Sequence, residues 1–272
     1  MMPSIDPEEV HTIIKSFIKA YIESAKTHSV VLGLSGGIDS AVMAVICNDM
    51  KELTNTHCLF LPDIATPKSD RKDVKRLMEK FDLSCDTIEI TDLVKSVIDL
   101  AHVDANQLTK ANIKARLRMV LIYTYANKTK SLVCGTSNKS ELLIGYFTKY
   151  GDGGVDFMPL GDLYKTQVFE LARYLNIPKE IIEKPPTAGL WKGQTDEKEL
   201  QLKYNQLDQI LYGLECKSDP RDISKNACVS IDHVLRIQQL RKTSQHKRRL
   251  ALIPKIGLRT PGLDWRSPVM EG

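Results

Sequence analysis

One short stretch constrains the fold of this chain more than any other. Residues 30–42 read Val-Val-Leu-Gly-Leu-Ser-Gly-Gly-Ile-Asp-Ser-Ala-Val. The apolar, β-branched start suits a strand that is buried on both faces, and the apolar run Ala41–Ile46 can continue as a helix packed on the same sheet. A polar turn with two adjacent glycines lies between them. The pattern therefore predicts a tight strand-to-helix connection in an α/β fold.

The residue types in this turn suit the binding of nucleotide phosphate. Gly36 and Gly37 let the backbone approach a ligand closely, and N–H groups at a helix start present partial positive charge to an anion. Ser35 and Ser40 add hydroxyl donors, and Asp39 can hold the magnesium that accompanies a polyphosphate. The turn is not a Gly-x-x-x-x-Gly-Lys-[Ser/Thr] loop, so no loop lysine is expected on the phosphates.

Strand and helix patterns alternate along the first half of the chain. A first helix is expected after the capping residue Asp6. Further strands are expected at Cys58–Leu61, Thr87–Ile90 and Ser131–Cys134, separated by helices over 72–80 and 106–125. The alternation predicts a doubly wound, mostly parallel sheet with helices on both faces, as in Rossmann-like folds. Ligands of such sheets bind at the carboxyl ends of the strands, where the glycine turn would lie.

The second half of the chain contains two segments with the composition of loops. Residues 150–154 are rich in glycine, and the segment Glu183–Thr195 contains Pro185-Pro186. Both carry aromatic and charged residues, so they fit either loops that order over a substrate or plain surface loops. Helices are expected over Asp196–Leu211, capped by Asp196, and over Ile231–Lys242.

Composition limits the possible class of protein. The 272 residues with 42% hydrophobic content can form one domain over 1–272, and a net charge of +4 does not demand a nucleic acid or an anionic lipid. The six cysteines form no Cys-x-x-Cys pair, which suggests reduced thiols in the cytoplasm. Neither a secretory signal nor an apolar run of about 20 residues is present, so no membrane role is expected.

Two further groups of residues are candidates for a ligand site. The helix over 106–125 carries an apolar stripe, and a helical projection places Arg116 at its border and Arg118 largely away from it. Arg116 is therefore the better candidate to reach an anionic ligand, although a solvated charge fits either arginine. Glu141 follows a second strand-turn pattern and could share magnesium with Asp39, or merely interact with a helix dipole.

Several motifs together resemble a known family. The Ser-Gly-Gly-Ile-Asp-Ser turn resembles the loop of the ATP-pyrophosphatase families, which cleave ATP between the α and β phosphates. The following motifs occur in the order seen in NAD synthetases: Lys-Ala-Arg-Leu-Arg-Met, Gly-Thr-Ser-Asn-Lys-Ser-Glu, Gly-Tyr-Phe-Thr-Lys-Tyr-Gly-Asp-Gly-Gly, Asp-Leu-Tyr-Lys-Thr-Gln-Val, Pro-Pro-Thr-Ala and His-Lys-Arg-Arg. The resemblance covers nearly the whole chain and implies an adenine nucleotide alpha hydrolase-like fold.

The resemblance implies the last step of NAD biosynthesis. Mg-ATP would adenylate the pyridine carboxylate of nicotinic acid adenine dinucleotide (deamido-NAD), and ammonia would then displace AMP. The implied catalytic residues are Asp39, Glu141, Lys165 and Asp156, of which Asp39 and Glu141 would bind Mg²⁺. The implied ATP-binding residues are Gly33, Leu34, Ser35, Gly36, Gly37, Ile38, Asp39, Ser40, Thr136, Lys165 and Thr187. The implied deamido-NAD-binding residues are Arg116, Lys149, Asp156, His246 and Lys247.

The resemblance also bears on partners and on the nitrogen donor. Only a short helical segment precedes Ser35, so we expect no fused glutaminase domain and the use of free ammonia, unless a separate subunit supplies it. A homodimer with the dinucleotide at the subunit interface is implied. Residues 61–70 resemble the adenine-side loops of the family only loosely, so no adenine contact is assigned there.

Two other readings stay open at this point. A tRNA-modifying ATP-pyrophosphatase would be expected to have paired cysteines and a broader basic surface than a net charge of +4 suggests. A regulatory module could bind ATP through the same loop without turnover. The presence of Asp39, Glu141 and Lys165 argues against such a module, because a sensor could tolerate their loss.

Overall fold

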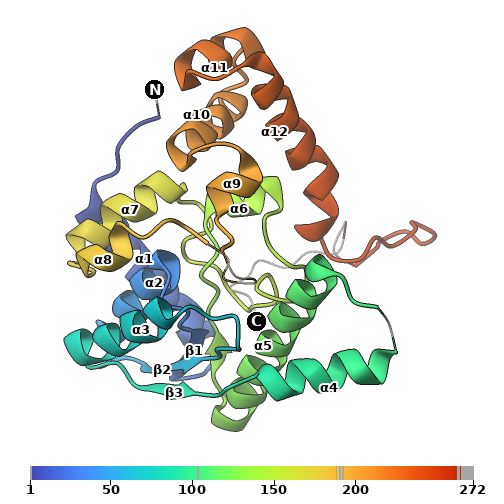
Figure 1. Ribbon diagram of the computed structural model, residues 1–272. Coiled ribbons are helices and arrows are strands. Elements are labelled where there is room, and N and C mark those ends of the chain that lie inside the picture. Colours follow the sequence, from blue (N-terminus) through green and yellow to red (C-terminus); the bar gives the residue numbers. More distant parts are fainter. Residues whose placement is uncertain are drawn as a thin grey trace.

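The computed structural model describes residues 2–102, 104–187, 189, 191, 193–261 and 264, and its centre is a four-stranded parallel sheet (Figure 1). The spatial order is β3-β2-β1-β4. The strands are β1 (Ser29–Gly33), β2 (Asn55–Phe60), β3 (Cys85–Thr87) and β4 (Leu132–Val133). The predicted parallel α/β architecture is confirmed.

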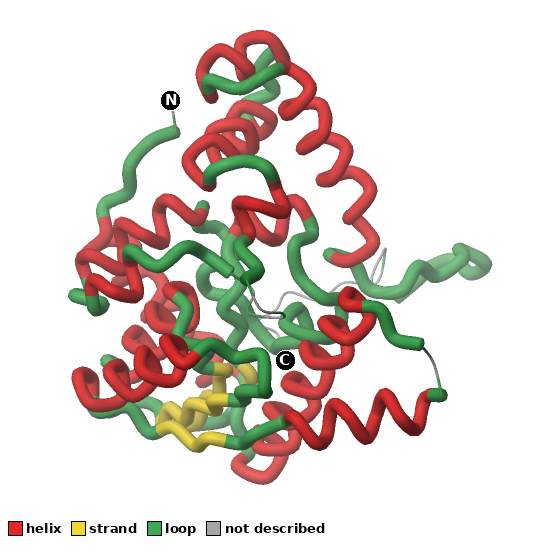
Figure 2. The backbone as a smooth tube through the Cα atoms, in the orientation of Figure 1, coloured by secondary structure: helices red, strands yellow, loops and turns green. Residues whose placement is uncertain are grey.

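Helices cover both faces of this sheet, as Figures 1 and 2 show. Val30 and Leu32 of β1 belong to the apolar cluster on one face, and Val31 belongs to the cluster on the other. The first cluster includes side chains of α1 (Pro7–Ser24), α2 (Ile38–Asn48), α3 (Lys68–Phe81), α7 (Lys165–Tyr174) and α8 (Lys179–Ile182). The second includes side chains of α4 (Thr91–Ala101) and α5 (Gln107–Thr129). Burial on both faces explains why the middle of β1, Val30–Leu32, is apolar.

The C-terminal helices form a separate apolar cluster beside the sheet layers. Figure 1 shows α10, α11 and α12 stacked away from the strands. The cluster joins α6 (Lys139–Ile144), α9 (Asp196–Leu200), α10 (Tyr204–Glu215), α11 (Pro220–Ala227) and α12 (Ile231–Thr243). Leu207 and Ile237 are fully buried in it. A 3₁₀ turn, η1 (Ser244–Lys247), follows α12.

Some predicted boundaries are confirmed and others are wrong. Asp6 caps α1, because its carboxylate accepts from the backbone N–H groups of Glu8 and Glu9. The strand predicted at Thr87–Ile90 is wrong, since β3 ends at Thr87 and Ile90 already precedes α4. Ile88 is exposed there, so its apolar side chain marks no buried strand.

The long helix predicted over Asp196–Leu211 is in fact two helices. Gln201 has a φ of 52°, which ends α9 and turns the chain into α10. Thr195, not Asp196, is the N-cap residue of α9. The turn lets Leu200 and Leu202 both enter the C-terminal cluster. A continuous helix would place these two side chains on different sides. Within the described residues, no helix is long and apolar enough to span a bilayer.

Candidate active site

The loop Leu34–Gly37, called the phosphate loop below, leaves the carboxyl end of β1 and enters α2. Gly36 has a φ of +80°, and a Cβ atom there would lie 2.9 Å from the backbone oxygen of Asp70. Both facts require glycine at this position. The prediction of a tight strand-to-helix turn is confirmed.

Hydrogen bonds of two serine hydroxyls stabilise this loop. The Ser40 hydroxyl accepts from the Ser35 N–H at 3.1 Å and donates to the Gly37 carbonyl at 3.0 Å. The Gly37 N–H donates to the Ser35 hydroxyl at 3.2 Å. Gly37 is the N-cap of α2 and has no side chain to cap it, so the start of this helix is open to an anion.

Three charged side chains meet beside the phosphate loop. The Lys165 ammonium contacts a carboxylate oxygen of Asp39 at 2.5 Å and one of Glu141 at 3.4 Å. The Asn138 side-chain amide donates to the other Asp39 oxygen at 3.0 Å. Asp39 comes from α2, Glu141 from α6 and Lys165 from α7. The fold thus brings residues from three distant parts of the sequence to one cluster, named the charge cluster below.

Burial sets the protonation of this cluster. Loss of solvation, and then repulsion by Asp39, raise the pKa of Glu141 to about 8, although Lys165 opposes the change. Burial alone would lower the pKa of Lys165, but Asp39 and Glu141 outweigh it and hold that pKa above its usual range. The lysine is therefore a permanent cation next to the phosphate loop.

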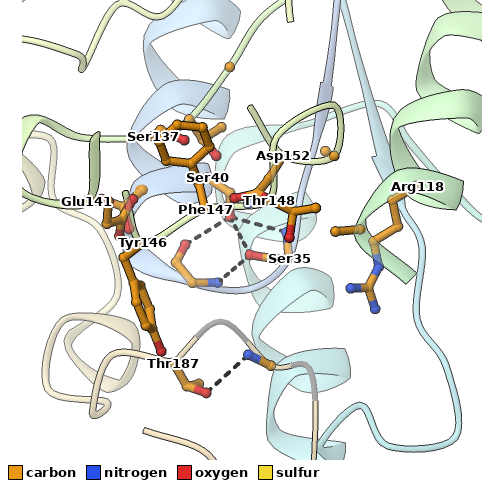
Figure 3. A pocket seen from close by; sticks show the side chains of 18 of the residues that line it. Ser35, Ser40, Arg118, Ser137, Glu141, Tyr146, Phe147, Thr148, Asp152 and Thr187 are labelled. Atoms are coloured by element: carbon orange, nitrogen blue, oxygen red, sulfur yellow. Dashed lines mark hydrogen bonds between the residues drawn. The ribbon is translucent and has the colours of Figure 1, made fainter. Parts of the chain in front are cut away.

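A cavity of about 400 Å³ opens in front of the phosphate loop and the charge cluster. Figure 3 shows Glu141 on one side of it and Arg118, from α5, on the other. Phe147, Thr148 and Asp152 contribute from the loop after α6. Its volume lies in the usual range for small-molecule sites.

Nearly all predicted ATP-binding residues line this cavity. They are Gly33, Leu34, Ser35, Gly37, Ile38, Asp39, Ser40, Thr136, Lys165 and Thr187. Gly36 is not among the lining residues, and its carbonyl accepts from the Lys184 ammonium at 2.7 Å. The predicted loop Glu183–Thr195 therefore contributes Thr187 to the cavity, while Ala188, Leu190 and Lys192 lie outside the described residues.

The residues predicted to bind deamido-NAD are mostly elsewhere. Only Lys247 is among the residues that line the cavity. The Lys149 ammonium donates to the His246 carbonyl at 2.7 Å, and the His246 side chain is exposed. The Asp156 carboxylate accepts from the Val133 N–H at 2.7 Å and from the Tyr123 hydroxyl at 2.9 Å. The fold does not bring Asp156 to the charge cluster with which it was grouped.

The prediction that Arg116 points inward, and Arg118 away, is wrong. Arg116 is exposed, whereas Arg118 lines the cavity. The Arg118 guanidinium donates to the Leu61 carbonyl at 2.9 Å and lies 3.9 Å from the buried carboxylate of Asp63. A helical projection considers only where the apolar side chains lie. It therefore did not show that the buried Asp63 carboxylate and the Leu61 carbonyl attract the Arg118 guanidinium inward.

Lys247 has a second role in this structure. Its ammonium donates to the carbonyls of Gly145 and Phe147, at 2.7 and 2.8 Å. The Arg248 guanidinium likewise donates to the carbonyls of Leu142 and Leu143. The basic run after α12 thus satisfies carbonyl groups at the end of α6, a use that the sequence pattern did not reveal.

The donor set at the charge cluster fits a magnesium ion shared with a polyphosphate. Asp39 and Glu141 both contact one ammonium group, so their oxygens lie close enough to converge on one small cation. Carboxylate oxygens are the ligands that Mg²⁺ prefers, and it commonly takes one or two from the protein plus phosphate and water oxygens. Among the described residues no group of three or more His, Cys, Asp or Glu side chains forms a complete protein-only site.

Several residues of the site were not singled out from the sequence. They are Asn138, Tyr146, Asp152, Lys184 and Asp196, all at or beside the cavity. Asn138 had a readable signal, because Asn138 and Glu141 form a capping box at the start of α6. Tyr146, Lys184 and Asp196 have no local pattern, since their partners come from other elements. Asp152 bonds within its own loop, where it accepts from the Thr148 N–H at 2.9 Å.

Comparison with known proteins agrees with this geometry. The sequence model of the family described as NAD synthase matches residues 10–251. The chain belongs to the NAD synthase family. The NH(3)-dependent NAD(+) synthetase of Archaeoglobus fulgidus is 44% identical over 92% of this chain and 97% of its own length. That of Sulfurisphaera tokodaii is 40% identical over 99% of this chain and 96% of its own.

Solved structures of NAD synthases and related enzymes share the fold. The NMN synthetase from Francisella tularensis superposes with a TM-score of 0.84 at 36% identity, covering 93% of this chain and all of that one. The NH3-dependent NAD synthetase from Campylobacter jejuni superposes with a TM-score of 0.78 at 30% identity, with the same coverage. The phosphate loop and the charge cluster lie within residues 10–251, which the family model matches.

Proposed function

We propose that this NAD synthase family member is an ammonia-dependent NAD synthetase, a ligase that forms a C–N bond at the expense of ATP. Mg-ATP adenylates the pyridine carboxylate of deamido-NAD and releases pyrophosphate, and ammonia then displaces AMP to give NAD. The observation that carries the proposal is the charge cluster of Asp39, Glu141 and Lys165 beside the phosphate loop. Family membership and the names of the relatives support it.

Adenylation needs its phosphates held and their charge neutralised. The open start of α2 and the hydroxyls of Ser35 and Ser40 face the cavity, so they can bind phosphate oxygens. Lys165 supplies a buried cation that can stabilise the charge that grows on the leaving pyrophosphate. Thr136 and Thr187 add hydroxyl groups on two further sides.

Asp39 and Glu141 would hold the magnesium ion of Mg-ATP. The ion would supply Lewis-acid neutralisation of the phosphate oxygens. With the ion bound, the high pKa of Glu141 would fall, since a cation favours the ionised carboxylate. Without a nucleotide, the two carboxylates therefore hold Lys165 in place. With Mg-ATP bound, they and the phosphate oxygens would share the magnesium ion.

We further propose a homodimer that binds the dinucleotide at its subunit interface. Arg116, Lys149, Asp156 and His246 match the dinucleotide contacts of the family, yet none is among the residues lining the cavity of the single chain. A site shared between two subunits would give such residues a ligand. In this proposal Asp156 contributes to dinucleotide binding or to the chemistry only in the assembled dimer.

The remaining parts of the proposal concern the nitrogen donor, the extent of the domain and the location of the enzyme. Free ammonia is the donor, in line with the names of the relatives. Residues 1–272 act as one synthetase domain, supported by the family match over residues 10–251. A cytoplasmic location is supported by the cysteines, all six of which are free thiols.

A coupled assay tests this function. Purified protein with Mg-ATP and deamido-NAD should release pyrophosphate and form AMP and NAD with ammonium, and far less NAD with glutamine or without a nitrogen donor. Formation of ADP instead of AMP, or the absence of amidated product, would overturn the proposal. An ATP-binding sensor would bind ATP without pyrophosphate release, and a tRNA-modifying enzyme would ignore the dinucleotide.

A second candidate substrate is nicotinic acid mononucleotide. The structural neighbour from Francisella tularensis is an NMN synthetase, and it shares 36% of its residues with this chain. The same assay with the mononucleotide in place of deamido-NAD compares the two. A higher kcat/KM for deamido-NAD supports the proposed function, and a higher value for the mononucleotide would reassign the substrate but not the chemistry.

A further inference from the structure

Lys184 lies at the cavity and connects three parts of the molecule beside the phosphate loop. Its ammonium donates to the Gly36 carbonyl at 2.7 Å, to the Asp70 carboxylate at 3.1 Å and to the Asp73 carboxylate at 2.7 Å. The lysine side chain is largely buried, and so are both carboxylates. Three acceptors satisfy the three N–H donors of a lysine, so the ammonium is held in one place.

The contact with Gly36 controls the direction of the loop's N–H groups. A peptide unit is planar and trans, so its C=O and its N–H point in opposite directions. Holding the Gly36 carbonyl toward Lys184 therefore turns the Gly37 N–H the opposite way, and it donates there to Ser35. Since Gly37 is the N-cap of α2, the same peptide unit sets how the open helix start faces the cavity.

The acidic partners of Lys184 belong to the start of α3. Asp70 and Asp73 lie in the first turns of α3, and the backbone of Asp70 packs directly against Gly36. Asp73 also pairs with Arg76 at 3.2 Å, so it keeps a cation when Lys184 is removed. The carboxylates thus hold the lysine, and the lysine holds the loop.

Lys184 also begins the segment that leads to Thr187. Pro185 and Pro186 follow it directly, and each has a fixed φ. A stiff connection of two residues separates the lysine anchor from Thr187, which lines the cavity. The position of Lys184 therefore limits where Thr187 emerges relative to Ser35 and Ser40.

We propose that Lys184 is a positioning residue for ATP: it fixes the anion-binding conformation of the phosphate loop and sets Thr187 against it. The inference rests on the proposed function in taking ATP as the nucleotide. Neither the sequence motifs of the family resemblance nor the charge cluster includes this lysine. Lys184 lines the cavity, but its ammonium already donates to Gly36, Asp70 and Asp73. It therefore acts through Gly36 and Thr187, without a hydrogen bond of its own to spare for the substrate.

The test compares Lys184→Met with four other variants, using calorimetric titration with Mg-ATP alone and steady-state kinetics. Lys184→Met should weaken ATP binding and raise the KM for ATP about tenfold or more, because a charge-assisted hydrogen bond that sets the loop is lost. The KM for deamido-NAD should change little. Lys179→Met is the matched control, since Lys179 is exposed and, among the residues that the structure describes, pairs only with Glu183.

Two neutralised variants separate positioning from stability. In Asp70→Asn/Asp73→Asn the amide oxygens can still accept from the Lys184 ammonium, which keeps its contact with Gly36, so ATP affinity should stay near that of the wild type. Lys184→Met/Asp70→Asn/Asp73→Asn contains no unpaired carboxylate, so it should regain thermal stability but not ATP affinity.

The proposal is overturned if the triple variant regains wild-type ATP affinity, or if Lys184→Met binds ATP like the wild type. Lys184→Arg should retain part of the affinity, because it keeps a cation with different geometry. ATP titration does not depend on NAD formation. If the wild type is active and Lys184→Met binds ATP as the wild type does, only this inference is refuted. If the wild type binds ATP but forms no NAD, only the proposed function is refuted.

Discussion

At Lys165, burial and charge act on the same side chain in opposite directions. Burial disfavours the ammonium, yet Asp39 and Glu141 favour it more strongly and raise the pKa of Lys165. The same burial disfavours the carboxylate of Glu141 and raises its pKa to about 8. Lys165 therefore stays charged, whereas Glu141 can hold its proton near neutral pH.

The two carboxylates of the charge cluster should be needed for adenylation but not for folding. Asp39→Asn and Glu141→Gln keep the shape of each side chain and remove a charge that would hold Mg²⁺. Each should reduce pyrophosphate release about a hundredfold or more and raise the Mg²⁺ concentration needed for half-maximal rate. Normal pyrophosphate release by both variants, with unchanged circular dichroism, would remove the metal assignment.

The raised pKa of Glu141 predicts how stability depends on pH without metal. In the folded state Glu141 keeps its proton up to about pH 8, whereas an ordinary glutamate loses it near 4.5. The folded state thus binds more protons in this window, so the free energy of unfolding should fall as pH rises through it. Urea unfolding with a metal chelator should show this fall in the wild type and a flatter profile in Glu141→Gln. Equal slopes would contradict the assignment.

At the scale of elements, one buried carboxylate orients the starts of two helices. Asp208 of α10 is fully buried and accepts from the Ser140 hydroxyl in α6. Its other oxygen accepts from the Thr166 N–H and hydroxyl, both at 2.9 Å, in the first turn of α7. The Ser140 hydroxyl in turn accepts from the Lys165 N–H at 2.9 Å. The C-terminal cluster thereby holds Lys165 and Glu141 at their places.

Removing this carboxylate should impair turnover from a distance. Asp208→Ala leaves three donors without their acceptor, the Ser140 hydroxyl and the N–H and hydroxyl of Thr166, and should cost about 2–4 kcal/mol in the free energy of unfolding. Asp208→Asn keeps one oxygen acceptor, so it should be more stable than Asp208→Ala. Its kcat should fall, while its KM for ATP should change less. The exposed Asp222→Ala is the control. A wild-type kcat in a folded Asp208→Asn variant would show that Asp208 does not position the cluster.

At the scale of the whole molecule, the sheet layers and the C-terminal helices have separate apolar clusters. Leu32 is fully buried in the first and Leu207 in the other. Bonds such as those of Asp208 to Thr166 of α7 join the two parts across the site. We therefore expect both clusters to unfold together.

This expectation can be checked with a pair of core substitutions. Leu32→Ala and Leu207→Ala should each destabilise the protein by about 2–5 kcal/mol and move one shared unfolding transition. Leu258→Ala should not move it, because Leu258 is 96% exposed. Two transitions, of which Leu207→Ala moves only one, would show that the C-terminal helices unfold independently.

Much of what depends on neighbours along the chain could be predicted from the sequence, although the end of β3 and the break between α9 and α10 could not. The buried strand before Ser35, the paired glycines and the cap at Asp6 are local patterns, and the parallel sheet and the phosphate loop follow from them. Motifs that match the family extended this to Lys165, Thr136 and Thr187, which line the cavity. Features that depend on partners from other elements became visible only in the folded structure. The inward turn of Arg118, the anchoring by Lys184 and the support from Asp208 arise because buried charges must find opposite charges or hydrogen bonds, wherever along the chain these lie.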